Sequence, residues 1–394
     1  MKKIGVLLLA VGAFVMGSAE LIVGGILNVI SDDLNISVSL AGQLITAFSL
    51  AFAIGTPIIV SLTSRVKRKS LVLYSLAVFL LGNLTTYLST DFRLLLLSRV
   101  LVGLGAGVYT VVAFGSAAKL VSRDQVGRAI SAIVLAISLS MVIGNPLGIA
   151  VAQLWDWRAI FAGLSGLALI ILILIMKKMP EVEGDSPVPF FRQFAVLKNL
   201  VIALGFIFSF FFTTSASIIN SYIAPYIQNT LRLDTAELGC MMLALGLFSV
   251  IGSRAGGAWT DRWGAPRSIY AGLSLFLATS ALLPFMSGST MAGLLFLLVW
   301  MFAMATSIPA IQTYFIGLAP DNSNLVLGMN MSILHLGVAI GAGIGGVAVD
   351  ALSTVEYHPW LSSVSAAISL VVAAFSIRKS REEGRQTPTS PASL

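Results

Sequence analysis

The stretch GAWTDRWG, residues 257–264, interrupts two long apolar runs with a short polar turn. It places a carboxylate, Asp261, beside a guanidinium, Arg262, with Gly257 and Gly264 at its ends. Such charges at a helix end can pair with a neighbouring helix and latch one conformation of a protein. A basic loop that only sets membrane topology is the alternative, but the spacing G-x-x-x-D-R-x-G favours a conformational latch.

The composition indicates an integral membrane protein. Of 394 residues, 57% are hydrophobic and only 10% are charged, against about 25% charged in an ordinary soluble domain. Apolar runs long enough to cross a ~30 Å hydrocarbon core recur along the chain, and the alternating strands of an outer-membrane barrel are absent from the sequence. We expect an all-α protein with transmembrane helices at 4–30, 38–63, 70–90, 92–120, 126–153, 158–177, 199–228, 236–260, 267–286, 290–318, 324–350 and 358–377.

The connections predict two bundles of six helices, 1–177 and 199–378. The one long connection, 178–198, lies between the sixth and seventh helices, and its prolines and mixed charge suit a flexible cytoplasmic linker. The polar tail, 379–394, is expected to be disordered.

The positive charges predict that both termini are cytoplasmic. Of the 24 Lys and Arg residues, only Arg93, Arg158 and Arg232 would then lie outside and Arg99 within a helix. The remainder fall on the cytoplasmic side, as the positive-inside rule requires, so the net charge of +7 reflects topology rather than nucleic-acid binding. The single cysteine, Cys240, lies in an apolar run, which excludes a disulfide framework or a cysteine metal site.

An internal repeat supports two homologous halves. An offset of 197 residues relates Gly42 to Gly239, Gly55 to Gly252, Arg65 to Arg262, Gly144 to Gly341 and Gly148 to Gly345. Two parallel halves joined by a linker are typical of secondary transporters, whose substrate site lies near the bilayer midplane between the halves.

A carboxylate, Glu20, lies inside the first apolar run in MGSAELIVGG, residues 16–25. A signal peptide cleaved before Glu20 is the alternative, but cleavage would remove the first insertion signal without improving the charge asymmetry. At helical spacing Glu20 shares a face with small and polar residues, namely Ala13, Gly17, Gly24 and Asn28, whereas the opposite face is aliphatic. We therefore expect the carboxylate to face inward and exchange protons, with a structural hydrogen-bonded role as the alternative.

Two further intramembrane motifs carry chemistry. Arg99 in LLLSRVLVGLGAGVY costs at least a few kcal/mol in lipid unless it faces a cavity or a partner, or snorkels outward. In SMVIGNPLGIAVAQ, Pro146 bends the helix while Gly144 and Gly148 permit close helix contact. A kink used only for packing is the alternative interpretation.

Polar residues in other apolar runs are candidate substrate contacts. They are Tyr109, Asn145, Ser217, Asn220, Tyr222, Trp300, Gln312, Asn330 and His335. A hydrogen bond to a neighbouring helix, worth about 1 kcal/mol or less, is an equal alternative for the weaker ones. His335 could also carry protons, but substrate contact is favoured.

On these motifs the chain resembles the major facilitator superfamily, whose signature is the pattern at 257–264. The first-half loop SLTSRVKRKSL keeps Arg65 but has Ser64 where the family has aspartate, which weakens the latch there. The segments AELIVGGILNVISDDLNIS and IGLAPDNSN resemble the drug:proton antiporter-1 family, near purine base and nucleoside efflux pumps and with sugar efflux proteins close by. Those relatives often carry a His and Tyr pair before the segment at Tyr222, which this chain lacks.

The resemblance implies proton-coupled export of a small organic solute by alternating access across the bacterial cytoplasmic membrane. Glu20 and Arg99 would couple protons, the motif at Gly144 would favour export, and the cargo would be purine-like, nucleoside-like or drug-like. A sugar or multidrug exporter of the same family is the alternative. We expect a monomer in the bilayer, whose partners are its solute and protons, without cofactor, metal or nucleic acid.

Three rival functions remain. An uptake symporter would use the same fold, and a receptor would bind solute without proton-dependent flux. An intramembrane serine protease would use Ser165 of GLSG, 163–166, with His335 as its base. Small residues at helix interfaces explain GLSG equally well, so we do not expect an enzyme.

Overall fold

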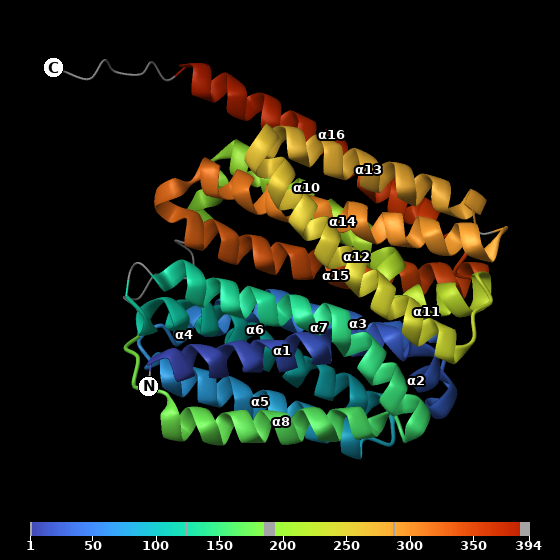
Figure 1. Cartoon of the computed structure of the whole chain (residues 1–394), viewed down its shortest axis with the longest axis horizontal. Coiled ribbons are helices and arrows are strands. Elements are labelled where there is room, and N and C mark those ends of the chain that lie inside the picture. Colours follow the sequence, from blue (N-terminus) through green and yellow to red (C-terminus); the bar gives the residue numbers. More distant parts are fainter. Residues whose placement is uncertain (1, 123–124, 185–193, 287, 387–394) are drawn as a thin grey trace.

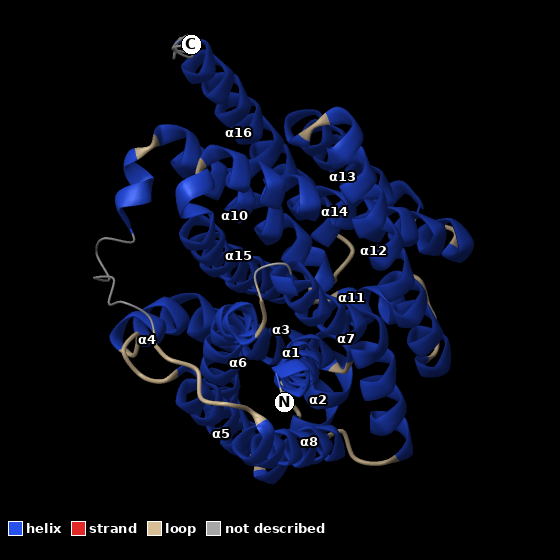
Figure 2. Cartoon of the chain, turned by 60° about the vertical axis from the view of Figure 1, so that its left-hand side comes forward, coloured by secondary structure: helices blue, strands red, loops and turns tan. Residues whose placement is uncertain are grey.

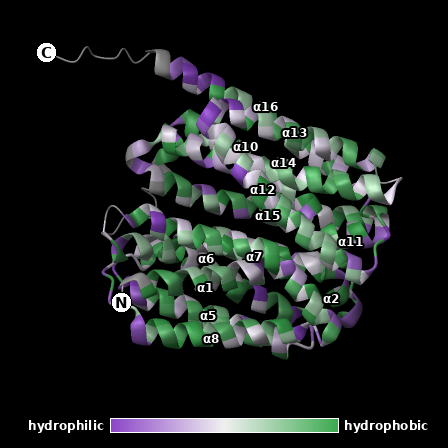
Figure 3. Ribbon diagram, viewed as in Figure 1, coloured by the Kyte–Doolittle hydropathy of each residue, from purple (hydrophilic) through white to green (hydrophobic). Residues whose placement is uncertain are grey.

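The structure, a computed structural model, describes the chain except for residues 1, 123–124, 185–193, 287 and 387–394. The described residues form helices and connecting loops, with no strand among them (Figure 2). Within the described part of the chain, twelve helical spans are long and apolar enough to cross a membrane, as the sequence predicts. Figure 3 shows hydrophobic residues along the middle of the helices and hydrophilic residues gathered near their ends. The fold is therefore all-α and transmembrane.

The helices form two bundles, stacked one above the other in Figure 1. The first bundle contains α1 (Lys2–Gly25), α2 (Leu27–Leu34), α3 (Val38–Leu50), the π-helical segment η1 (Ala51–Gly55), α4 (Thr56–Leu62), α5 (Arg68–Leu88), α6 (Phe92–Leu120), α7 (Val126–Leu154) and α8 (Arg158–Lys178). The second contains the 3-10 helix η3 (Phe194–Lys198), α10 (Leu200–Asn220), α11 (Ile223–Pro225), the π-helical η4 (Tyr226–Thr230), α12 (Thr235–Trp263), α13 (Ala265–Met286), α14 (Thr290–Leu318), the 3-10 helix η5 (Pro320–Asn322), α15 (Ser323–Leu352) and α16 (His358–Gln386).

The start of the C-terminal tail, expected to be disordered from residue 379, is helical in the structure. α16 continues to Gln386, so residues 379–386 are helical, supported by an ion pair at 3.2 Å between Arg378 and Glu382 one turn apart. The rest of the expected tail lies outside the described residues. Much of the expected linker, at 185–193, lies outside them as well.

Local sequence explains where several helices begin and end. The Asp91 side chain accepts hydrogen bonds from the backbone N–H groups of residues 93 and 94 at the start of α6. Asp234 and Glu237 form a reciprocal capping box at the start of α12. At the end of that helix Gly264 has φ of +81°, a conformation that side chains with a Cβ rarely adopt.

The repeat-related glycines make equivalent contacts in the two bundles. A Cβ on Gly144 of α7 would meet Ser18 of α1, and a Cβ on Gly341 of α15 would meet Ser217 of α10. Gly148 and Gly345 contact Ile22 and Tyr222, respectively, at the next turn. Absent side chains thus permit the same close helix approach in each half, and the two bundles are pseudo-symmetric.

The start of α1 and the end of α16 lie at the same end of the helices in Figure 1. We call this end the terminal face and the other end the opposite face. The bundles touch through α3 against α15 and through α7 against α12. Two hydrogen bonds join them among the described residues: Asn28 Nδ2 donates to Gln228 Oε1 at 2.6 Å, and Thr46 Oγ1 donates to the Ala339 carbonyl at 3.4 Å. These contacts lie between the middle of the helices and the opposite face.

Candidate functional site

Glu20 lies on α1 at the contact between the two bundles. Its side chain is 32% exposed, and its Oε1 lies 3.8 Å from Nδ1 of His335 on α15. That distance is too long for a hydrogen bond but short enough for an ion pair when the imidazole is protonated. The structure therefore brings together two ionisable residues that are 315 positions apart in the sequence.

His335 is held by an aromatic ring of the first bundle. Its imidazole stacks on Phe52 with ring centroids 3.6 Å apart and planes inclined by 19°. Phe52 belongs to η1, and such π-helical turns occur frequently at functional sites. Nδ1 of His335 is buried and has no hydrogen-bond partner among the described residues. Nδ1, the ring nitrogen that faces Glu20, therefore has no hydrogen bond within the described residues that would compete with an interaction with the carboxylate.

Arg99 anchors the segment that carries the carboxylate. The residue is 1% exposed, which rules out outward snorkelling in this conformation. One Nη donates to the carbonyl of Ala19 at 3.1 Å, directly before Glu20, and the guanidinium carbon lies 4.9 Å from the Phe48 ring centroid. Nε and the other Nη have no hydrogen-bond partner within the described part of the chain. The Arg99 guanidinium thus holds the backbone next to Glu20 without forming a direct ion pair with its carboxylate among the described residues.

The Gly-Pro-Gly motif of α7 packs against the same stretch of α1. Gly144 lies beside Ser18 and Gly148 beside Ile22, so the motif contacts α1 on either side of Glu20 along the chain. Pro146 is inside the helix, where it removes one backbone hydrogen bond. The neighbouring Asn145 has a buried Oδ1 without a hydrogen-bond partner among the described residues. α7 therefore positions the helix segment on which the carboxylate lies.

Four other predicted contacts have polar atoms bonded inside their own bundle. Tyr109 donates to the Leu9 carbonyl at 3.0 Å, and Trp300 Nε1 donates to Ser280 Oγ at 3.0 Å. Ser217 donates to the Val338 carbonyl at 2.8 Å and Tyr222 to the Ala342 carbonyl at 3.0 Å. A substrate role for these residues would require their bonds to be exchanged, and it stays a prediction.

Tyr222 also reaches the first bundle. Its hydroxyl occupies the space that a Cβ on Gly42 of α3 would need, and Gly346 of α15 lies on its other side. The ring is fully buried. Tyr222 therefore contributes to closing the bundles toward the opposite face.

The three remaining candidates lie in different surroundings. Asn330 is 2% exposed, and its Oδ1 has no hydrogen-bond partner within the described residues. Asn220 ends α10, and its carbonyl lies near Gly24 of α1. Gln312 on α14 is exposed.

The polar turn at the terminal face carries exposed charges. Asp261, Arg262 and the repeat-related Arg65 are exposed, and none of them forms an ion pair within 4.0 Å among the described residues. In the first half the basic loop instead contacts the segment that follows α8, where Lys67 Nζ lies 3.3 Å from Glu181. The predicted latch is therefore unpaired in this conformation.

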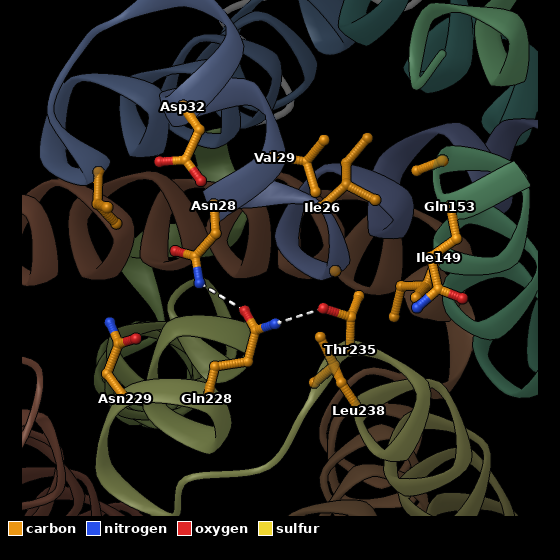
Figure 4. A pocket seen from close by; sticks show the side chains of 13 residues that line it. Ile26, Asn28, Val29, Asp32, Ile149, Gln153, Gln228, Asn229, Thr235 and Leu238 are labelled. Carbon is orange, nitrogen blue, oxygen red and sulfur yellow. Dashed lines mark hydrogen bonds between the residues drawn. The ribbon is translucent and has the colours of Figure 1, made fainter. Parts of the chain in front are cut away.

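A cavity of about 390 Å³ lies between the bundles near the opposite face (Figure 4). The hydrogen bond from Asn28 to Gln228 crosses it, and Gln228 Nε2 donates onward to Thr235 Oγ1 at 3.4 Å. The sequence placed Asn28 on the Glu20 face of the first helix. It gave no signal for Gln228 or Gln153, since a glutamine near a membrane boundary is common.

Two pseudo-symmetric helical bundles with ionisable side chains where they meet are the architecture of many secondary transporters. The chain matches the family profile of the Major Facilitator Superfamily over residues 9–322 and 205–393. It is 34% identical over 364 residues to an uncharacterized MFS-type transporter, YbcL, of Bacillus subtilis (strain 168), covering 92% of this chain and 93% of the relative. A protein of Helicobacter pylori (strain J99) named a probable sugar efflux transporter is 24% identical over 357 residues, 89% of this chain and 90% of that protein.

Among solved structures, that of a D-xylose-proton symporter superposes with a TM-score of 0.77 at 15% identity, covering 93% of this chain and 96% of the symporter. This similarity concerns the fold alone. The chain belongs to the Major Facilitator Superfamily. It is accordingly a transporter of small molecules and not an enzyme.

Proposed function

We propose that the protein exports a small organic solute in exchange for protons, by alternating access across the bacterial cytoplasmic membrane. The observation that carries this proposal is the contact between Glu20 of the first bundle and His335 of the second, 3.8 Å apart. A charged carboxylate between apolar bundles is costly unless water or a partner reaches it. Gain or loss of a proton there changes the free energy of bringing the bundles together, which is what coupling requires.

The conformation supports an inward-facing state. The bundles touch from their middle to the opposite face, while the charged turn at Asp261 and Arg262 is unpaired at the terminal face. The distribution of Lys and Arg favours a cytoplasmic location for the terminal face and both termini. In this state solute would enter from the cytoplasm, and Glu20 would release its proton there.

The direction of transport rests on the helix contact between α7 and α1. The Gly-Pro-Gly motif, which is associated with exporters, packs on either side of Glu20 along α1. Both helices belong to the first bundle, so the motif and Glu20 would move together as that bundle rocks against the second, which would change the surroundings of the carboxylate. The proposed coupling residues Glu20 and Arg99, and His335 beside them, are brought together by the two bundles of one chain, so the proposed mechanism needs only a monomer.

For the cargo we propose a purine-like, nucleoside-like or drug-like molecule, with a sugar as the second candidate. Tyr222, near the bundle contact, would offer an aromatic surface to a planar solute only after the bundles separate, because its ring is fully buried in this conformation. The relative named a probable sugar efflux transporter favours the second candidate.

Everted membrane vesicles test the proposal. Acidifying the vesicle interior should drive accumulation of a radiolabelled solute, chosen from adenosine, L-arabinose and a lipophilic cation, by the unaltered protein. Glu20→Gln should abolish this accumulation but retain exchange of labelled for unlabelled solute. The control Glu382→Gln removes another carboxylate, one in an exposed surface pair worth about 0.3–0.5 kcal/mol, and should behave as the unaltered protein.

Two results would contradict the proposal. Proton-driven accumulation that survives Glu20→Gln would remove Glu20 from the coupling. Accumulation driven by an alkaline interior, and reversed by an acidic one, would identify an uptake symporter.

A further inference from the structure

The cavity near the opposite face has the volume and the mixed polar and apolar lining of a small-molecule binding site. It lies between α2 and α7 of the first bundle and η4 and α12 of the second, and its volume of about 390 Å³ falls in the range of small-molecule sites. Six polar side chains line it: Asn28, Asp32, Gln153, Gln228, Asn229 and Thr235. It is separate from the Glu20 and His335 contact, which none of its lining residues joins.

The lining is rich in carboxamides, which both donate and accept hydrogen bonds. Asn28 and Gln228 bond to each other across the bundles, and Gln228 bonds to Thr235. Gln153 and Asn229, from opposite bundles, line the cavity without a hydrogen bond to another described residue. Two amides are therefore available to a solute now, and two more become available when the bundles separate.

The charge of the lining selects against anions. Asp32 is the single charged side chain among the described residues that line the cavity, and none of its neighbours there is basic. The adjacent Asp33, by contrast, pairs with Arg158 at 2.8 Å. An anionic solute would meet an uncompensated carboxylate.

The apolar part of the lining is aliphatic. Ile26, Val29, Ile149 and Leu238 contribute to the wall, and no aromatic side chain lines the described cavity. A planar base would find no ring on which to stack. Hydroxyl groups on a saturated ring could instead bond to the carboxamides while the ring itself lies on the aliphatic wall.

We propose that this cavity is a second solute site, at the exit side of the transporter, for an uncharged polyhydroxylated solute with a single saturated ring. The site rests on the proposed export function, and of the two cargo candidates named there it favours the second, a sugar, over the planar purine-like one. Solute hydroxyls compete with the Asn28–Gln228 hydrogen bond, so occupancy of the site favours separation of the bundles at the opposite face.

Protection of an engineered cysteine tests the site. Ala152→Cys lines the cavity and is made in a chain whose single cysteine, Cys240, is replaced by alanine. The reaction with a membrane-impermeant maleimide is timed in right-side-out vesicles with external L-arabinose, adenosine or gluconate. The control Ser289→Cys is exposed, outside the cavity, in the loop before α14.

External L-arabinose at twice its dissociation constant should slow labelling at position 152 about threefold, since two thirds of the sites are then occupied. It should leave position 289 unchanged, gluconate should protect neither cysteine, and Gln153→Leu with Asn229→Leu should abolish protection. Thr235→Cys is the second reporter if Ala152→Cys fails to fold.

Protection by adenosine but not by arabinose would overturn the proposed solute class. Absence of protection by a solute that everted vesicles do accumulate would overturn the site itself and leave proton-coupled export standing. Loss of export with protection retained would overturn proton-coupled export and leave the site standing.

Discussion

The hydrogen bond between Asn28 and Gln228 joins the bundles at the opposite face through two uncharged side chains 2.6 Å apart. We predict that its removal shifts the protein toward the state that is open on that face. A neutral hydrogen bond contributes about 0.5–1.5 kcal/mol net, and 1.4 kcal/mol corresponds to a factor of ten in an equilibrium constant. The open population should therefore rise about 2- to 12-fold.

The perturbation is made with apolar replacements of similar size, Asn28→Leu and Gln228→Met. Ser39 on α3 provides the reporter, because it is 4% exposed and lies beside Gly346 of the second bundle. A cysteine at position 39, in the chain with Cys240→Ala, should react with an impermeant maleimide only when the bundles separate. Its labelling rate then follows the open population.

A double-mutant cycle makes the prediction specific. If the two side chains act through one bond, the double variant should label no faster than either single variant, which gives a coupling of about 0.5–1.5 kcal/mol. The cysteine at exposed position 289 should label at one rate in all four proteins. Unchanged labelling in the single variants, or a double variant that equals the product of the two single effects, would refute a gating role for this bond.

Two glycine substitutions test other contacts. A Cβ on Gly246 of α12 would lie 2.6 Å from Val142 Cα of α7, so Gly246→Ala should force the bundles apart and raise the labelling rate at position 39. The control Gly343→Ala places no atom within 4 Å of the added Cβ and should leave that rate unchanged. Gly264→Ala, at φ +81° and ψ 156°, should cost about 1–3 kcal/mol and lower the midpoint of thermal unfolding. Gly343→Ala lies inside a helix and should keep or raise the midpoint.

The sequence predicted the fold because a membrane leaves few choices. Each spanning segment must satisfy its backbone hydrogen bonds within one helix, so apolar length alone located the twelve spans. It could not locate breaks inside an apolar run. The run at 4–30 is divided at Gly25 into α1 and α2, and the run at 199–228 ends as a regular helix at Asn220 before α11 and η4.

The sequence predicted only the part of the candidate site that depends on a single helix. Helical periodicity placed Glu20 on a face of small residues, and the structure places that carboxylate where the bundles meet. Its neighbour His335 and the ring of Phe52 come from distant helices, so their approach depends on how the bundles pack. A polar side chain in an apolar run looks the same whether it faces a cavity or, like Trp300, bonds inside its own bundle.

The repeat clarifies why the ionisable groups matter. The offset of 197 residues relates Glu20 to Ser217, which bonds to the Val338 carbonyl inside the second bundle, and relates Ser138 to His335. The glycine contacts within each bundle are therefore duplicated, whereas the ionisable groups are not. In the proposed mechanism, a proton gained or lost at Glu20 would act at one contact between the bundles and would change the free energy of bringing them together, which is the quantity that alternating access requires to change.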